Sequence, residues 1–424
     1  MTVLPTQQLV DHLFRHESGK MVAVLTRIFG MHNLEMVEDV VQESFLKAMQ
    51  FWKFDNMPDN PAAWLMQTAR NKAIDIIRRE QYFHKYSAEL SGQLLADTEA
   101  TVGQFFSEAE ISDSQLRLIF ACCHPQLKEE DQVALTLKTV SGFGPSEIAR
   151  ALVTTESTIQ KRLYRAKEYI REHQLQMEIP AGYELNKRLE TVYVVLYLLF
   201  NEGYNSLKAD ELIRKDVCAE AMRLCLLLTE SKAGNKPATF ALLSLMCLQA
   251  SRFDSRLDED NTIVLLEKQD RSKWDMRLIQ LGYKYLNFSS SGDTLSIYHI
   301  ESAIAAEHCM AATYEETNWK RMLQLYDMLL LQKPAPVVKL NRAVVLMQTG
   351  EVNAAIDMVW KIEEIEKLLA SQHIYSAVLG EMYKQKGNFT EAQKLFRQSL
   401  QLVTSLPEKK LLETKIAACI SRLK

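Results

Sequence analysis

Two short segments of the chain concentrate the side chains that could bind a phosphate backbone. The first, residues 70–79, contains one acid and four basic residues: Arg70, Lys72, Arg78 and Arg79. The second, residues 161–171, contains one acid and five basic residues: Lys161, Arg162, Arg165, Lys167 and Arg171. Clustered lysine and arginine supply affinity for phosphates, although the whole chain carries a net charge of −4. Both segments therefore predict contacts with a nucleic acid.

Aromatic side chains flank the first basic segment. Phe51 and Trp64 precede it, and Tyr82 and Phe83 follow it. Bases of a single strand stack on such rings while basic side chains hold the backbone. A second interpretation remains open, in which Trp64 and Phe51 are core residues and the charges are only solvated.

The residues between the basic segments have the opposite charge. From 86 to 116 there is no Lys or Arg, and there are six acids: Glu89, Asp97, Glu99, Glu108, Glu110 and Asp113. Apolar periodicity is weak before about Phe105, which predicts a flexible linker in the first half of an acidic connector, residues 85–113.

Catalytic and metal-binding patterns have little support in this chain. It has neither a phosphate-binding glycine loop nor an H-E-x-x-H pair, which predicts a protein that is not an enzyme and binds no cofactor. Cys122, Cys123 and His124 are too close together for a zinc site, so we expect no metal. Seven cysteines in apolar helical runs, with no signal peptide and no apolar run long enough to cross a bilayer, predict a cytoplasmic protein without a membrane segment.

Helices must position these side chains. Gly and Pro are scarce, and apolar residues recur at helical spacing from 7 to 80, so we expect an all-α protein. The last helix of this part is predicted over 61–82, with Asn60 as its N-cap and Pro61 at its first position. The segment 38–45 has the pattern of an ordinary amphipathic helix.

The second basic segment lies in a predicted helix-turn-helix. Residues 146–152 and 156–171 form two helices joined by a three-residue break. The polar face of the second helix presents the side chains that would reach DNA bases and phosphates: Ser157, Thr158, Gln160, Lys161, Arg162 and Arg165. A helical hairpin that serves only as core architecture is the alternative.

The remainder, residues 181–424, is predicted to be a helical domain that contains a repeat at about 336–405. The segments 343–359 and 380–396 place small, bulky and glycine positions at the same offsets. Such offsets suit two antiparallel helices around a tight turn and match the tetratricopeptide pattern.

Taken in order, the segments of residues 10–172 resemble the extracytoplasmic-function (ECF) sigma factors of the sigma-seventy superfamily. Residues 38–48 resemble the region-two helix that binds the β′ clamp helices of RNA polymerase, and the resemblance assigns that contact to Asp39, Gln42 and Glu43. Residues 60–65 and 69–75 are similar to the segment that opens and reads the minus-ten element. The resemblance therefore assigns DNA contacts there to five side chains: Trp64, Arg70, Lys72, Arg78 and Arg79.

The helix-turn-helix resembles the region-four module that reads the minus-thirty-five element. The resemblance implies domains at 1–84 (region two) and 114–175 (region four), and the partners promoter DNA and core polymerase, through its β′ clamp helices and β flap. The chain departs from the pattern in two places. Leu152, Val153 and Thr154 stand where a glycine usually marks the turn, and about 250 residues follow region four. This extension resembles a subgroup of these factors with tetratricopeptide-like C-terminal domains.

These patterns favour a sigma factor that starts transcription at specific promoters and is regulated by its C-terminal domain, through an intramolecular contact or a separate protein partner. Two alternatives remain. The chain could be a repeat scaffold that binds a protein or peptide, with a DNA-binding module at its N-terminus. A dimeric repressor would leave the helix at 38–48 and the acidic connector without roles.

Overall fold

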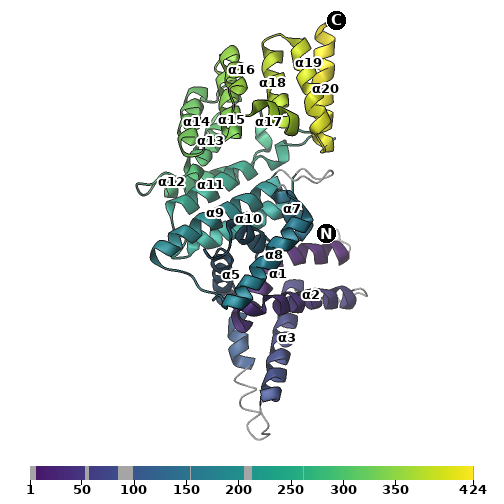
Figure 1. Cartoon of the computed structure of the whole chain (residues 1–424), viewed down its shortest axis with the longest axis vertical. Coiled ribbons are helices and arrows are strands. Elements are labelled where there is room, and N and C mark those ends of the chain that lie inside the picture. The colour runs from purple at the N-terminus through teal and green to yellow at the C-terminus, as the bar shows by residue number, and fades with distance from the viewer. Residues whose placement is uncertain are drawn as a thin grey trace. The chain divides into compact units, whose positions relative to one another are not determined.

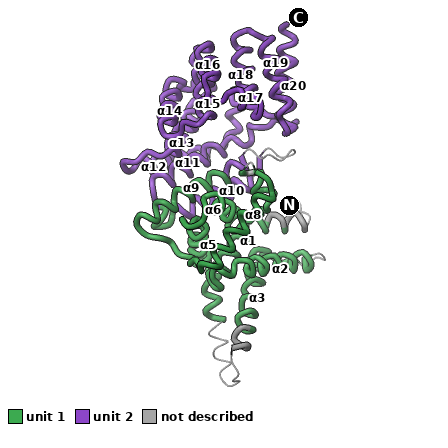
Figure 2. Tube along the Cα trace, viewed as in Figure 1, with its two compact units in different colours: residues 1–199, 230–234 green, residues 200–229, 235–424 purple. Residues whose placement is uncertain are grey.

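The structure is a computed structural model, and it describes residues 6–52, 57–84, 99–152, 154–204, 213–260 and 262–423. Within these ranges the regular elements are helices, apart from one isolated bridge between Leu257 and Ile263, so the predicted all-α class is confirmed (Figure 1). The chain divides into two compact units, residues 1–199 with 230–234 and residues 200–229 with 235–424 (Figure 2).

Unit 1 contains two groups of helices and the start of α9 (Gly182–Tyr204). The others are α1 (Thr6–Phe29), η1 (Met31–Asn33), α2 (Leu34–Phe51), α3 (Pro61–His84), α5 (Glu108–Cys122), α6 (Glu129–Thr139), α7 (Pro145–Ala151) and α8 (Glu156–His173). α1, α2 and α3 pack together, and α5 lies along α1. α6, α7 and α8 form the second group.

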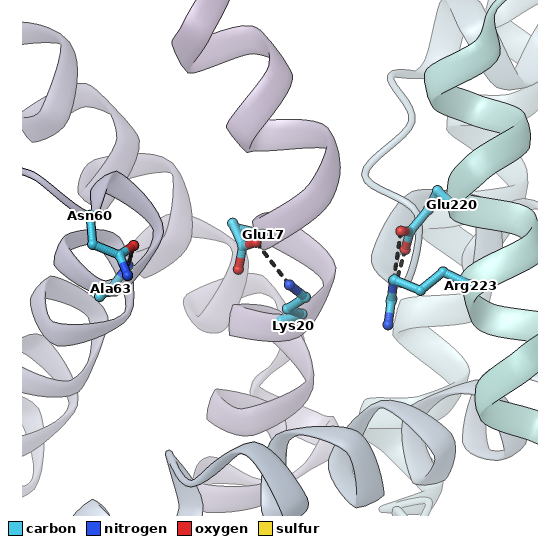
Figure 3. A network of polar contacts seen from close by, with 6 residues as sticks. All are labelled: Glu17, Lys20, Asn60, Ala63, Glu220 and Arg223. Carbon is cyan, nitrogen blue, oxygen red and sulfur yellow. Dashed lines mark hydrogen bonds and ion pairs between the residues drawn. The ribbon is translucent and has the colours of Figure 1, made fainter. Parts of the chain in front are cut away.

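The first group closes around apolar side chains at helical spacing. Three of these side chains are fully buried: Leu25 of α1, Val37 of α2 and Leu65 of α3. The side chain of Asn60 accepts a hydrogen bond from the backbone N–H of Ala63 at 3.0 Å, so the predicted cap of α3 is confirmed (Figure 3). The start of α3 is thus fixed by one side chain.

The acidic connector differs in part from the prediction. Residues 99–105 are helical, and α5 begins at Glu108, within the segment predicted to be a linker. Glu110 and Asp113 on α5 form ion pairs with Arg27 on α1, at 2.6 and 2.9 Å. These long-range ion pairs anchor the end of the connector. The predicted flexible half, 85–98, lies outside the described residues.

The helix-turn-helix prediction is confirmed by α7 and α8. Ile148, Ile159 and Ala166 lie on the shared face and are at most 1% exposed. Thr155 is the N-cap of α8, and its hydroxyl accepts a hydrogen bond from the backbone N–H of Thr158 at 3.3 Å.

Unit 2 is a succession of helices, and many of its larger contacts join helices that follow each other in sequence. They are α10 (Lys215–Glu230), α11 (Pro237–Ala250), α12 (Met276–Ser289), α13 (Ile297–Met310), α14 (Trp319–Gln332), α15 (Pro336–Gln348), α16 (Val352–Trp360), α17 (Ile365–Ser371), α18 (His373–Gln385), α19 (Phe389–Leu402) and α20 (Leu406–Leu423). Three short 3-10 helices precede α12: η2 (Phe253–Ser255), η3 (Leu266–Lys268) and η4 (Arg271–Lys273).

Two helical hairpins of unit 2, α15–α16 and α18–α19, coincide with the repeated segments. Each turn contains a glycine with positive φ, Gly350 at 93° and Gly387 at 85°. Only glycine adopts this conformation without strain, which explains why the two turns share it. Gly380 packs against the ring of Phe396, where a Cβ atom would lie 2.7 Å from the ring.

Candidate nucleic-acid interface

The predicted minus-ten side chains lie along α3. Arg79 is exposed, whereas Arg70, Lys72 and Arg78 are partly buried. Lys72 forms an ion pair with Glu43 of α2. A residue that is predicted to contact DNA is thus paired with a residue that is predicted to contact the polymerase. Opposite charges at the surface attract only weakly in water, so a phosphate or a protein partner can replace either of them.

The acidic connector reaches the same face of α3. The guanidinium of Arg78 forms an ion pair with the carboxylate of Glu99. Arg70 donates a hydrogen bond from Nη2 to the backbone carbonyl of Glu99 at 3.4 Å. An anionic side chain from the connector therefore occupies part of the basic face.

The aromatic side chains before α3 form one cluster. The Trp64 ring stacks on Phe51, with centroids 6.0 Å apart, and meets Trp52 edge to face at 5.4 Å. Trp52 is 2% exposed and Phe51 is 54% exposed. Trp64 is thus partly a core residue, as the second interpretation held, while Phe51 offers a free ring surface on which a base could stack. Tyr82 and Phe83 have no described side chains.

The predicted minus-thirty-five side chains lie together on one face of α8. Ser157, Gln160, Lys161 and Arg165 are exposed, and Thr158 and Arg162 are partly buried. Two of them are paired with α6. Arg165 contacts Asp131 at 2.8 Å, and Arg162 contacts Glu130 at 3.4 Å. Asp131 is buried, so its pair with Arg165 also ties α8 to α6.

The predicted polymerase-binding residues, Asp39, Gln42 and Glu43, are exposed on α2. The neighbouring Glu38 pairs with Lys167 of α8 at 2.6 Å, and the two side chains are 13% and 17% exposed. Glu35 and Arg171 form a second, looser pair between the same helices at 3.9 Å. The predicted region-four helix therefore contacts the predicted polymerase-binding helix.

Two further contacts join the helical groups of unit 1. Arg15 of α1 pairs with Glu147 of α7 at 2.8 Å, and its guanidinium lies 4.8 Å from the ring centre of Phe143. At Gly19 of α1 an added Cβ atom would lie 1.9 Å from the carbonyl oxygen of Val140. Glycine is the residue that permits this approach.

Sequence reasoning missed the acids that neutralise the basic faces. Glu99, Glu130 and Asp131 lie 21 or more positions from the arginines they contact. Helical periodicity shows which face of a helix is polar but not which distant helix lies beside it. The acidic composition of the connector was the one signal that pointed to Glu99.

The thiols of Cys122 and Cys123 are held in the protonated form. Burial raises the pKa of each thiol from 9.0 to about 12. Their sulfur atoms lie near the hydroxyls of Thr139 and Thr136, at 3.2 and 3.8 Å.

Within the part of the chain that the structure describes, no group of three or more His, Cys, Asp or Glu side chains is placed to hold a metal ion. No described helix is long and apolar enough to span a bilayer.

Three segments of the chain match protein families. Residues 13–82 match sigma-70 region 2, and residues 117–170 match sigma-70 region 4. Residues 188–290, which bridge the end of unit 1 and the start of unit 2, match a family of unknown function, DUF6596. The matched segments of regions 2 and 4 contain the two basic faces described above.

Proteins with similar sequences match either nearly the whole chain or about a third of it. The chain is 34% identical over 387 residues to an uncharacterized protein of Rhizobium meliloti, covering 91% of this chain and 90% of that one. The ECF RNA polymerase sigma factor SigL of Mycobacterium tuberculosis is 28% identical over 32% of this chain and 72% of its own length. SigX of Bacillus subtilis, another ECF RNA polymerase sigma factor, is 24% identical over 32% and 69%. The chain therefore belongs to the family of the Rhizobium meliloti protein and, with its region 2 and region 4 domains, is a sigma-70-type factor of the ECF kind.

Proposed function

We propose that this sigma factor directs core RNA polymerase to specific promoters in the cytoplasm and helps to melt them. The observation that carries the proposal is the pair of basic faces on α3 and α8, one inside a segment that matches sigma-70 region 2 and the other inside a segment that matches sigma-70 region 4. Arg70, Lys72, Arg78 and Arg79 hold the non-template strand in this proposal, and Trp64 with Phe51 supports an unstacked base.

In the same proposal α8 reads the minus-thirty-five element. Ser157, Thr158 and Gln160, near the N-terminus of the helix, contact base edges in the major groove. Lys161, Arg162 and Arg165 hold the flanking phosphates. Asp39, Gln42 and Glu43 on α2 face the β′ clamp helices of the polymerase.

Promoter-dependent transcription in vitro tests the proposal. The full-length protein, added to core polymerase with fragments of its genome, should yield transcripts that start at defined sites. Gln160→Ala should change or weaken the choice of start sites, whereas Lys320→Ala, an exposed lysine on α14 of unit 2, should not. Transcription from random sites at all salt concentrations would refute it.

We also propose that unit 2 regulates regions 2 and 4, through an intramolecular contact or a separate protein partner. The helical hairpins at Gly350 and Gly387 and the earlier resemblance to tetratricopeptide-containing factors support a role in protein contacts. If the chain is instead primarily a repeat scaffold, substitutions on α3 and α8 will leave its partner binding unchanged and no promoter will respond to it.

A further inference from the structure

A cavity of about 510 Å³ lies within unit 2, and the proposed function does not use it. Its walls come from the end of α13, from α14, α15, α18 and α20, and from the segment between η2 and α12. Most of the lining side chains are apolar or aromatic, and they include Leu266, Met322, Val344, Val378 and Leu412. A cavity of this size and lining accommodates a small organic molecule with an apolar body.

The charges in the cavity wall are three carboxylates and one lysine. The lysine, Lys415, forms an ion pair with Glu381. A carboxylate oxygen of Glu408 lies 3.7 Å from Nε2 of His373. The third carboxylate, Glu267, forms neither an ion pair nor a hydrogen bond with the residues that the structure describes. The lysine in the wall is thus neutralised, and negative charge is left at Glu267.

Glu267 stands beside an aromatic corner. The rings of Tyr314 and Trp319 meet edge to face, with centres 4.9 Å apart. Both rings and Glu267 line the cavity and also a second, more polar hollow beside it. Burial, together with Glu267 and Glu315, raises the pKa of the Tyr314 hydroxyl to about 12. Glu315 and Lys268 also line the second hollow, where their opposite charges cancel. The corner therefore joins the apolar cavity to the negative charge of Glu267.

The histidine in this corner adds no positive charge. Burial, together with Arg252 and Arg271, lowers the pKa of His308 to about 3, so its ring is neutral. Neither arginine lines the cavity or the second hollow. The rings of His308 and Trp319 meet edge to face, 5.8 Å apart. The corner thus consists of three uncharged rings.

Two polar groups in the cavity wall have no hydrogen-bond partner among the residues with described side chains. Tyr326 lines the cavity, and burial, with a smaller effect of Glu301, raises the pKa of its hydroxyl to about 12. Nδ1 of His308 is buried and also lacks a partner. Buried polar groups normally form hydrogen bonds, so these two point to an occupant of the cavity, either water or a ligand.

We propose that unit 2 binds a small organic cation whose ammonium group lies between Glu267 and the rings of Tyr314 and Trp319 and whose apolar body fills the cavity. The carboxylate attracts the cation, and the faces of the two rings add a cation–π attraction. The class of ligand follows from the lining, since the walls are apolar and the unpaired charge is negative. An anion of the same shape is repelled by Glu267. The proposal does not depend on the sigma-factor function.

Four probes that share one apolar body test the proposal on the full-length protein: octylammonium, octyltrimethylammonium, octanol and octanoate. In titration calorimetry at millimolar concentration, at least one of the two cations should bind saturably and more tightly than octanol, and octanoate should bind most weakly. The tighter cation identifies the head group, because only octylammonium can donate hydrogen bonds. Added salt should weaken binding of the cations more than binding of octanol.

Glu267→Gln removes the charge and keeps the shape of the side chain. It should weaken binding of the octyl cation about 3-fold or more and leave octanol unchanged; the effect is modest because Glu267 is exposed and water screens its charge. The matched control is Glu363→Gln, at an exposed glutamate between α16 and α17 that lines neither hollow. This variant should keep all four affinities.

Val344→Phe tests the place of the apolar body. It narrows the cavity and should weaken the octyl cation and octanol alike, because both place the same body there. The proposal would be overturned by any of four results. These are octanoate binding as tightly as the cations, no saturable binding of either cation, an unchanged cation affinity in Glu267→Gln, and an unchanged affinity for the octyl probes in Val344→Phe.

Discussion

At the scale of single residues, the basic side chains differ in whether they already have a partner. Arg78, Arg162 and Arg165 pair with carboxylates of the same chain. Arg79 and Lys161 are exposed, and no ion pair joins either to a described residue. A phosphate that binds the exposed residues displaces only water and salt. These two side chains should therefore contribute to the first encounter with DNA.

Lys161→Ala should weaken promoter binding about equally for all sequences, because a lysine that contacts a phosphate reads no base. The slope of log affinity against log salt should fall by about 1. Fluorescence anisotropy of the complete polymerase complex, measured at several salt concentrations, provides the slope. Lys320→Ala is the control, and a loss confined to one promoter sequence would show that Lys161 reads bases instead.

The cap of α3 makes a prediction about stability. Asn60→Ala removes the acceptor for the Ala63 N–H and should lower the free energy of unfolding by about 1 kcal/mol. Asn60→Asp keeps an acceptor and should be nearly neutral. Urea unfolding followed by circular dichroism measures both. If the two variants are equally destabilised, the cap does not hold the helix start.

The buried thiols predict a loss of stability at high pH. In the folded protein burial raises the pKa of Cys122 and Cys123 to about 12, from the ordinary 9.0. Above pH 9 the unfolded chain therefore binds fewer protons than the folded one, and the free energy of unfolding falls as pH rises toward 12. Urea midpoints at pH 8 and pH 10 should show this decrease, and it should be smaller in a Cys122→Ala, Cys123→Ala protein. An equal decrease in both proteins would contradict it.

At the scale of elements, α8 lies against α2 through the pair of Lys167 and Glu38. Under the proposed function α2 binds the polymerase, so this contact and polymerase binding should compete. Lys167→Glu places two like charges at a site that is less than one-fifth exposed and should separate the helices. We expect core polymerase to bind this variant about 10-fold more tightly.

Lys161→Glu is the matched control, because it makes the same charge change on the exposed face of α8. Its affinity for core polymerase, measured without DNA, should stay near that of the unchanged protein. Weaker binding of the Lys167→Glu variant would show that the contact supports the binding form instead of competing with it.

The helices themselves could largely be predicted from the sequence, because their signals are local. Asn60 and Pro61 mark the start of α3, and the break at 153–155 separates α7 from α8. The partners of the site could not be predicted. Glu99, Asp131 and Glu38 meet the basic residues only after the chain folds back on itself. The sequence also leaves the role of Trp64 open, because it does not show that the Trp64 ring meets the buried ring of Trp52 edge to face.

At the scale of the whole molecule, α9 continues from unit 1 into unit 2. Arg188 on α9 is 6% exposed and donates a hydrogen bond from Nη1 to the carbonyl of Phe120 at 3.3 Å. Arg188 lies beyond the predicted end of region four at 175, which stays a prediction, and its contact with α5 is part of unit 1. No local pattern in the sequence reveals this long-range contact.

A protein truncated after residue 176 should be less stable than one truncated after residue 234, because only the longer one keeps Arg188 and the rest of unit 1. Thermal unfolding compares the two, and the full-length Arg188→Ala protein isolates the contribution of the side chain. The longer truncation then tests regulation, since promoter activity equal to that of the full chain would argue against a regulatory unit 2. Equal melting temperatures for both truncations would contradict the role of Arg188.

The pairing of Glu99 with Arg78 has a consequence for the thermodynamics of the entire complex. The carboxylate acts as a built-in counterion, and DNA must exchange places with it. On binding, the freed carboxylate attracts cations from solution, which offsets part of the cations that the DNA releases. The net ion release of this acidic sigma factor should therefore be smaller than its basic residues suggest. Promoter binding by this protein should therefore weaken less when the ionic strength rises than its number of basic residues predicts.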